Sequence, residues 1–354
     1  MPDETTAPDG RAARRPRVTV FSTGGTIASV PGGGQAAAPA LTAADLVAAV
    51  PQMTDVAAVT AVPFRQVASP DLDLGDMIAL AQVIEQAVAD GATGAVVTQG
   101  TDTLEETAFA LDLLWHGETP VVLTGAMRNP ALPGADGPAN LLGAVQLAAN
   151  PAAHGLGVLV VFNDEVHLPL FVRKTHATSP ATFRSPLTGP IGWIVEGRSR
   201  IALRPVARHA IQLPAAPQAI PPVGLLKATL GDDGRLVPAF AASGYRGLVV
   251  EAMGGGHLPR AMVEHLAALT HRMPVVLASR TGAGEGLRGT YGFPGSETDL
   301  LRRGLIHAGA LDGPKAKVLL SLLLAAEAPS EAITNAFAAI GIPGSLPPFR
   351  WPAP

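Results

Sequence analysis

Two clusters of hydroxyl and carboxylate side chains are the most reactive features of this 354-residue chain. Thr26 follows Thr23-Gly24-Gly25 and a β-like run, and Gly100-Thr101-Asp102-Thr103 follows a second apolar run. Each cluster is expected where a strand gives way to a turn and a helix, which is where ligand sites form in open α/β sheets. Behind two glycines, Thr26 should have an accessible hydroxyl and nearby backbone N–H groups that can approach a substrate closely.

These residue types suit nucleophilic chemistry. A threonine hydroxyl becomes a nucleophile when a base or a charge network assists its deprotonation. Thr101 can relay a proton, and the Asp102 carboxylate can hold a cationic group of a substrate. The alternative is that such residues only stabilise turns and helix ends. We assign that role to Thr103, in a Thr-x-x-Glu capping box with Glu106, whereas the grouping of Thr26, Thr101 and Asp102 at two strand ends favours function.

The composition excludes several classes of protein. Hydrophobic residues make up 47% of the chain and charged residues 15%, and the net charge is −4 without a basic stripe, so we expect no nucleic-acid partner. The apolar runs are shorter than the about 20 residues that span a bilayer, so we expect no membrane partner. Cysteine is absent, which excludes disulfides, thiol catalysis and thiolate metal sites.

Signatures of other chemistries are missing. The sequence has no G-x-G-x-x-G after its first strand, no phosphate-binding G-x-x-x-x-G-K-[ST] and no G-x-S-x-G elbow. Its nine histidines include no H-E-x-x-H pair, so we predict neither a metal nor a cofactor. Arg14-Arg15 is followed by a strand instead of the apolar region of an export signal, which favours a cytoplasmic protein.

Strand-like and helix-like runs alternate along the chain, which predicts an α/β fold. We expect a larger N-terminal domain at residues 17–203, with a parallel sheet covered by helices on both faces, and a smaller C-terminal α/β domain at residues 223–354. The Pro-rich stretch at residues 204–222 reads as a linker, and residues 1–16 as a disordered lead. Between Ser29 and Leu41 the chain is rich in Gly and Ala, which predicts a mobile loop that either covers Thr26 as a lid or is an inert connection.

The motifs together resemble one known family. Thr23-Gly24-Gly25-Thr26-Ile27-Ala28 and Gln99-Gly100-Thr101-Asp102-Thr103-Leu104-Glu105-Glu106-Thr107 look like the two signature segments of bacterial-type L-asparaginases, the asparaginase/glutaminase family. The similarity extends from Arg17 to about Ala326. It includes the segments at residues 123–128, 134–141, 158–164, 174–185 and 315–320.

The resemblance implies hydrolysis of a side-chain amide through an acyl-threonine intermediate, without a cofactor. By this analogy Thr26 attacks the amide carbon, and Asp102 and Ser69 hold the α-amino and α-carboxylate groups of asparagine. Backbone N–H groups near Gly25 and Thr101 stabilise the oxyanion. The implied catalytic residues are Thr26, Thr101, Asp102 and Arg184, and the implied substrate-binding residues are Gly25, Ser69, Gly100, Thr101, Asp102 and Ala126.

The chain departs from the family pattern at several positions. Arg184 follows Thr-Phe where the family usually has a lysine, so we expect its guanidinium to anchor Asp102 without acting as a base. The lid has no tyrosine, because the chain has tyrosine only at positions 245 and 291. Pro70 replaces a common glutamine, and His257 stands where an asparagine often sits.

The family also implies a homo-oligomer, a dimer or a tetramer, in which a neighbouring subunit completes each site. His257 and Glu297 are candidates for that contribution, or else ordinary residues of a loop and a helix start. Three alternatives to an L-asparaginase remain: a glutaminase-asparaginase of broader specificity, a weakly active amino-acid-binding relative, and a subunit of a tRNA-dependent amidotransferase. The last usually carries an extra N-terminal domain, whereas about sixteen residues precede the first strand here.

Overall fold

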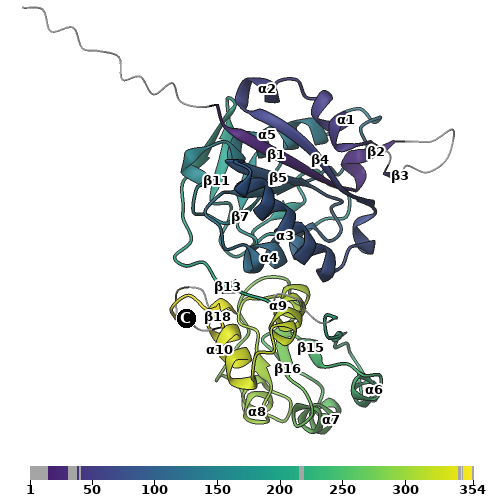
Figure 1. Ribbon diagram of the computed structural model, residues 1–354. Coiled ribbons are helices and arrows are strands. Elements are labelled where there is room, and N and C mark those ends of the chain that lie inside the picture. The colour runs from purple at the N-terminus through teal and green to yellow at the C-terminus, as the bar shows by residue number, and fades with distance from the viewer. Residues whose placement is uncertain are drawn as a thin grey trace, which may run out of the picture.

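The computed structural model describes residues 15–30, 38–39, 41–214, 219–341, 344 and 346–352. Two α/β units lie one above the other in Figure 1, and each has its own sheet. The α/β class predicted from the sequence is therefore confirmed. Residues 1–14 of the expected disordered lead and most of the expected lid lie outside the described residues.

The larger unit contains an eight-stranded sheet in the order β12-β11-β8-β7-β6-β5-β1-β4. The neighbouring strands β4, β1, β5, β6 and β7 run parallel to one another. The strands β8, β11 and β12 join the sheet by antiparallel pairing. The bounds are β1 Arg17–Gly24, β4 Ala58–Val67, β5 Gly94–Thr98, β6 Val121–Thr124, β7 Val158–Phe162, β8 Glu165–His167, β11 Gly192–Val195 and β12 Arg198–Ile201.

The central strands are apolar because both faces of the sheet are covered. Successive side chains of a strand point to opposite faces. Accordingly, Val97 of β5 belongs to one buried cluster with α3 and α4, and Val96 belongs to another with α1 and α5. The expected helices on both faces are thus present, and the ends of the parallel strands are held in a rigid frame.

Two of the N-terminal helices, α1 and α3, begin at capping boxes. Thr42 and Asp45 form the capping box of α1, and Asp73 and Asp76 form that of α3. Within the described ranges, no helix is long and apolar enough to cross a membrane. The bounds are α1 Ala43–Ala48, α2 Met53–Val56, α3 Leu74–Ala89, α4 Leu104–Leu114 and α5 Gly137–Ala148.

The smaller unit has a four-stranded parallel sheet in the order β14-β15-β16-β17. Its strands are β14 Val223–Lys227, β15 Gly247–Ala252, β16 Val275–Ser279 and β17 Ile306–His307, and its helices are α6 Val237–Ala242, α7 Arg260–Thr270, α8 Glu297–Arg302, α9 Gly313–Ala325 and α10 Ser330–Gly341. Among the described residues of the stretch 204–222, none belongs to either sheet. That stretch does contain a short strand, β13 (Ala210–Ile211), which pairs with β18 (Arg350–Trp351).

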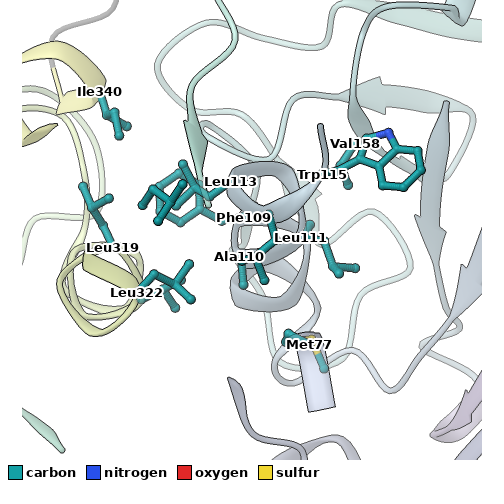
Figure 2. Packing of buried hydrophobic residues seen from close by; sticks show 14 of the residues in the cluster. Met77, Phe109, Ala110, Leu111, Leu113, Trp115, Val158, Leu319, Leu322 and Ile340 are labelled. Carbon is teal, nitrogen blue, oxygen red and sulfur yellow. The ribbon is translucent and has the colours of Figure 1, made fainter. Parts of the chain in front are cut away.

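The two units share one hydrophobic core where α4 packs against α9. Figure 2 shows Phe109 and Leu113 of α4 facing Leu319 and Leu322 of α9, with Ile340 of α10 at the side. This apolar contact fixes α4, whose N-terminus follows the Thr101-Asp102 cluster, against the C-terminal unit. The position of α9 relative to that cluster is therefore set by packing.

Truncating the core of this contact should destabilise both units. Leu319 is fully buried, so Leu319→Ala should lower the free energy of unfolding by about 2–5 kcal/mol, measured by urea denaturation. Leu230→Ala is the matched control, because Leu230 is 97% exposed and its truncation should change the free energy by about 0.5 kcal/mol or less. Equal effects of the two substitutions would contradict the shared core.

Candidate active site

The end of β1 turns sharply into a single turn of 3₁₀-helix, η1 (Thr26–Ala28). Gly24 and Gly25 have φ angles of 106° and 82°, a region that favours glycine because it has no Cβ. Thr26 is the first residue of η1 and is partly exposed. Its hydroxyl forms no hydrogen bond with another described residue. The turn therefore presents a hydroxyl that is available for chemistry.

The two clusters singled out in the sequence meet at this turn. A Cβ atom on Gly25 would lie 2.1 Å from the backbone nitrogen of Gly100, and a Cβ on Gly100 would lie 2.7 Å from Oγ of Ser69. Only glycine allows such close approach. The loops after β1, β4 and β5 thus come together, and they bring Gly25, Ser69 and Gly100 into one small region.

The loop after β6 closes the same region from another side. A Cβ on Gly125 would lie 2.5 Å from the carbonyl oxygen of Gln99, so this loop passes directly over the end of β5. Ala126 is fully buried and belongs to the same cluster as Ile27 of η1. The carboxylate of Asp136 fixes the loop by accepting hydrogen bonds from the backbone N–H groups of Met127 and Arg128, at 3.0 and 2.8 Å.

Thr103 has a different role from the one its sequence suggested. It lies at the N-cap of α4, but its side chain makes no capping hydrogen bond, so the expected box with Glu106 is wrong. Its hydroxyl instead donates to the carbonyl of Ser69 at 3.0 Å and accepts from the side chain of Gln99 at 3.2 Å. These long-range contacts outcompete the local cap, and they tie the Ser69 loop to the loop after β5.

A lysine that the sequence analysis did not single out provides the cation of the site. Lys174 lies in β9 (Arg173–Lys174), and its Nζ donates to Thr101 Oγ1 at 2.9 Å and to Asp102 Oδ1 at 2.6 Å. The Lys174 side chain is only 16% exposed, whereas that of Asp102 is 64% exposed. The ammonium therefore approaches from the protein side and leaves the Asp102 carboxylate open to solvent or ligand.

The prediction that Arg184 contacts Asp102 is wrong. The Arg184 guanidinium instead donates to both carboxylate oxygens of Glu165, at 3.0 and 3.1 Å. The reason is register, because β10 (Phe183–Arg184) pairs with β9 so that Phe183 is opposite Lys174. Neighbouring residues of a strand point to opposite sides, so Arg184 is directed away from the side that Lys174 occupies.

Lys174 could have been found from composition and position. Only four of the 25 basic residues are lysines, at positions 174, 227, 315 and 317. The lysine at 174 follows the apolar residues 170–172 and lies at the start of a segment that already resembled the family. The missing information was the pairing of β9 with β10, which sequence spacing alone does not reveal.

A buried histidine lies beside the Arg184–Glu165 pair. The ring of His167 is fully buried, with Nδ1 at 3.0 Å from Ser185 Oγ and Nε2 at 3.5 Å from a Glu165 oxygen. Within the described residues Nε2 has no hydrogen-bond partner. Burial, with a smaller contribution from the Arg184 charge, lowers the pKa of His167 from 6.5 to about 4. The ring is therefore neutral near neutral pH.

The C-terminal unit carries a second polar pair, formed by the two residues expected to serve a neighbouring subunit. His257 Nε2 lies 3.1 Å from Glu297 Oε2, and Glu297 is fully buried. The other Glu297 oxygen accepts hydrogen bonds from the backbone N–H groups of Thr290 and Tyr291, both at 2.7 Å. Tyr291 and Phe293 contact the His257 ring and are each 46% exposed. The pair thus lies beneath an exposed aromatic surface.

The geometry suits amide or ester hydrolysis. An available hydroxyl at Thr26 lies on a loop that touches the backbone of Gly100, and Thr101 is hydrogen-bonded to an ammonium. Among the residues that the structure describes, no group of three or more His, Asp or Glu side chains is arranged to hold a metal ion.

Comparison with known families agrees with this geometry. The model of the asparaginase N-terminal domain matches residues 17–207, and that of the glutaminase/asparaginase C-terminal domain matches residues 222–337. The chain belongs to the asparaginase family. The resemblance inferred from the two threonine motifs is thereby confirmed.

Relatives match the asparaginase over most of its length. It is 36% identical to the probable periplasmic L-asparaginase of Haemophilus influenzae, with 88% of this chain and 90% of the relative covered. It is 31% identical to the glutaminase-asparaginase of Pseudomonas aeruginosa, with 90% of this chain and 89% of the relative covered. A solved structure of the probable cytoplasmic L-asparaginase from Campylobacter jejuni superposes with a TM-score of 0.83 at 32% identity. The match covers 92% of this chain and 99% of that structure.

The neutral state of His167 should make stability depend on pH. Because folding holds the pKa of His167 below its unfolded value of 6.5, the stability it contributes is fully present above pH 6.5 and is lost as the pH falls towards 4. The loss should reach about 3 kcal/mol, measured by urea unfolding at pH 7.5 and 4.

The variant His167→Gln isolates this effect, because carboxylates that titrate in the same range remain in both proteins. Its free energy of unfolding should change less between the two pH values than that of the wild type. His116→Gln removes an exposed histidine and should keep the wild-type dependence. An unchanged dependence in His167→Gln would show that the buried ring is not responsible.

Proposed function

We propose that this asparaginase hydrolyses L-asparagine to L-aspartate and ammonia through an acyl-threonine intermediate on Thr26. The observation that carries the proposal is the hydroxyl of Thr26, which is available on a glycine turn whose backbone touches the Thr101-Asp102 loop. Membership of the family and relatives named L-asparaginase support the reaction class. A pure amino-acid-binding protein needs no such nucleophile.

Substrate binding uses the two ends of asparagine. Asp102 has an exposed carboxylate that can pair with the α-amino group while Lys174 holds its other side. The Ser69 hydroxyl, close to Gly100, is the donor for the α-carboxylate. Ala126 offers its backbone carbonyl to the scissile amide from the loop after β6. In this proposed binding mode the side-chain amide lies between Thr26 and Thr101.

The reaction proceeds in two steps. Thr26 Oγ bonds to the amide carbon while backbone N–H groups near Gly25 and Thr101 stabilise the oxyanion, at about 3–4 kcal/mol per donor. The C–N bond then breaks, and the proton lost by the Thr26 hydroxyl, relayed through Thr101, ends on the nitrogen, which leaves as ammonia. Water hydrolyses the resulting ester, releasing aspartate and restoring the Thr26 hydroxyl.

Lys174 sets the direction of proton transfer in this scheme. Its ammonium donates to Thr101 Oγ1, so the Thr101 hydroxyl must direct its own hydrogen elsewhere. That hydrogen is available to the departing nitrogen. The same ammonium anchors and orients the Asp102 carboxylate, the task that the sequence assigned to Arg184.

Glutamine is the second candidate substrate, because a relative of similar identity and coverage is named glutaminase-asparaginase. Steady-state ammonia release from both amides separates the two assignments. We assign asparagine as the preferred substrate. An equal or greater kcat/KM for glutamine would instead show that the protein is a glutaminase-asparaginase of broader specificity.

We further propose that the protein is a homo-oligomer, a dimer or a tetramer, in which each site receives the His257–Glu297 pair of a neighbour. The exposed aromatic side chains of Tyr291 and Phe293 around this pair support an interface there. Light scattering together with activity on dilution tests this proposal. A fully active monomer would overturn it.

The cytoplasmic location expected from the sequence stays a prediction. The related structure from Campylobacter jejuni is described as cytoplasmic, whereas the Haemophilus influenzae relative is described as periplasmic. Fractionation of the native host with an antibody against the protein decides between the two compartments.

Replacement of the nucleophile should abolish turnover without unfolding the protein. Thr26→Ala should lower kcat by several orders of magnitude, because the acyl-enzyme cannot form, and its thermal midpoint should stay near that of the wild type. Thr60→Ala, which truncates an exposed threonine of β4, is the control and should keep full activity. Near-wild-type ammonia release by Thr26→Ala would reject the assignment.

Removing the charge of Lys174 and removing that of Arg184 should have very different effects on kcat/KM. Lys174→Met removes the charge that contacts Thr101 and Asp102 and should reduce kcat/KM by at least about 100-fold. Arg184→Ala breaks only the pair with Glu165 and should keep kcat/KM within about threefold of the wild type. A larger loss in Arg184→Ala than in Lys174→Met would return the cation role to the arginine.

A further inference from the structure

Three consecutive residues before and at the catalytic lysine are each held by a separate polar contact. The carbonyl of Val172 accepts a hydrogen bond from Nζ of Lys315 in α9. The Arg173 guanidinium donates to the carbonyl of Gly282 and forms an ion pair with Asp312 at 2.9 Å. The backbone N–H of Lys174 donates to Glu105 at 2.6 Å. Two of these three positions are therefore fixed by the C-terminal unit.

The contacts from the C-terminal unit converge at the first turn of α9. Asp312 is the N-cap of this helix, and its Oδ1 accepts from the backbone N–H of Lys315 at 3.0 Å. Its other oxygen pairs with Arg173 and lies 3.9 Å from Lys315 Nζ. The Asp312 carboxylate thus contacts both Arg173 and Lys315, and it connects the start of α9 to the segment before Lys174.

Lys315 is unusual because it is 1% exposed. Burial lowers the pKa of Lys315, while the carboxylates of Asp312 and Glu105 oppose that shift. Burying an ammonium costs free energy, and an apolar side chain of similar length would pack here without that cost. The hydrogen bond to Val172 gives the buried charge a task that an apolar residue cannot perform.

Rigid placement of the Val172–Lys174 segment matters because the Lys174 side chain must reach two acceptors at once. Its contacts with Thr101 and Asp102 are 2.9 and 2.6 Å, and both depend on where the backbone of β9 lies. A displacement of about 1 Å at a reacting group can lower a rate by about 100-fold.

We propose that Lys315, together with the Arg173–Asp312 ion pair, is a positioning residue that holds Lys174 at Thr101 and Asp102. The C-terminal unit thereby contributes to catalysis within its own chain, separately from any contribution to a neighbour. The inference rests on the proposed hydrolase function, in which Lys174 is catalytic.

A double-mutant cycle tests the coupling. Lys315→Met keeps most of the length of the side chain and removes the donor to Val172, and it should lower kcat by about 10- to 100-fold with a smaller change in KM. In the Lys174→Met background, measured at high enzyme concentration, the same substitution should change kcat by less than about twofold, because there is no ammonium left to position.

Lys317→Met is the matched control, since Lys317 lies in the same helix with an exposed side chain, and it should leave kcat unchanged. If Lys315→Met does not fold, as judged by circular dichroism, Arg173→Gln in the same cycle tests the other contact. Independent, multiplicative effects of Lys315→Met and Lys174→Met would overturn the positioning role, as would an unchanged kcat in Lys315→Met. A wild-type protein that releases no ammonia would instead refute the proposed function.

Discussion

The interaction on which the site depends is the ammonium of Lys174 held between Thr101 Oγ1 and Asp102. It requires a carboxylate and a hydroxyl at the end of β5 and a lysine delivered from a distant segment of the chain. The β5 loop is fixed by the parallel sheet. The lysine lies on the two-residue strand β9, which belongs to a two-stranded sheet with β10 and not to the main sheet. Its position therefore depends on the elements packed around it.

The sheet supplies the other half of the arrangement. Parallel strands end at the same edge, so the loops after β1, β5 and β6 meet there. Glycines at positions 25 and 100 allow the backbones to come closer than any side chain would permit. The partly exposed Thr26 hydroxyl and the Lys174-bound Thr101 hydroxyl consequently lie on touching loops.

The sequence predicted those features that depend on local patterns. Apolar strands followed by glycine-rich turns located the Thr26 and Thr101 clusters, and the alternation of elements predicted the fold class. Features set by long-range pairing were missed. Lys174 faces the site because of the β9–β10 register, and Thr103 bonds to Ser69 instead of capping its helix. Strand β4 was also missed, because Pro63 within it weakens a strand pattern and is tolerated at the edge of a sheet.

We propose that Thr26, which follows β1 and is supported by the Lys174 contacts, becomes acylated during amide hydrolysis. The most direct measurement is rapid acid quenching of the enzyme during turnover of L-asparagine, followed by peptide mapping by mass spectrometry. We expect an aspartyl adduct on the peptide that contains Thr26, and none in Thr26→Ala. Ammonia release without any adduct, or an adduct on the peptide that contains Thr101, would contradict it.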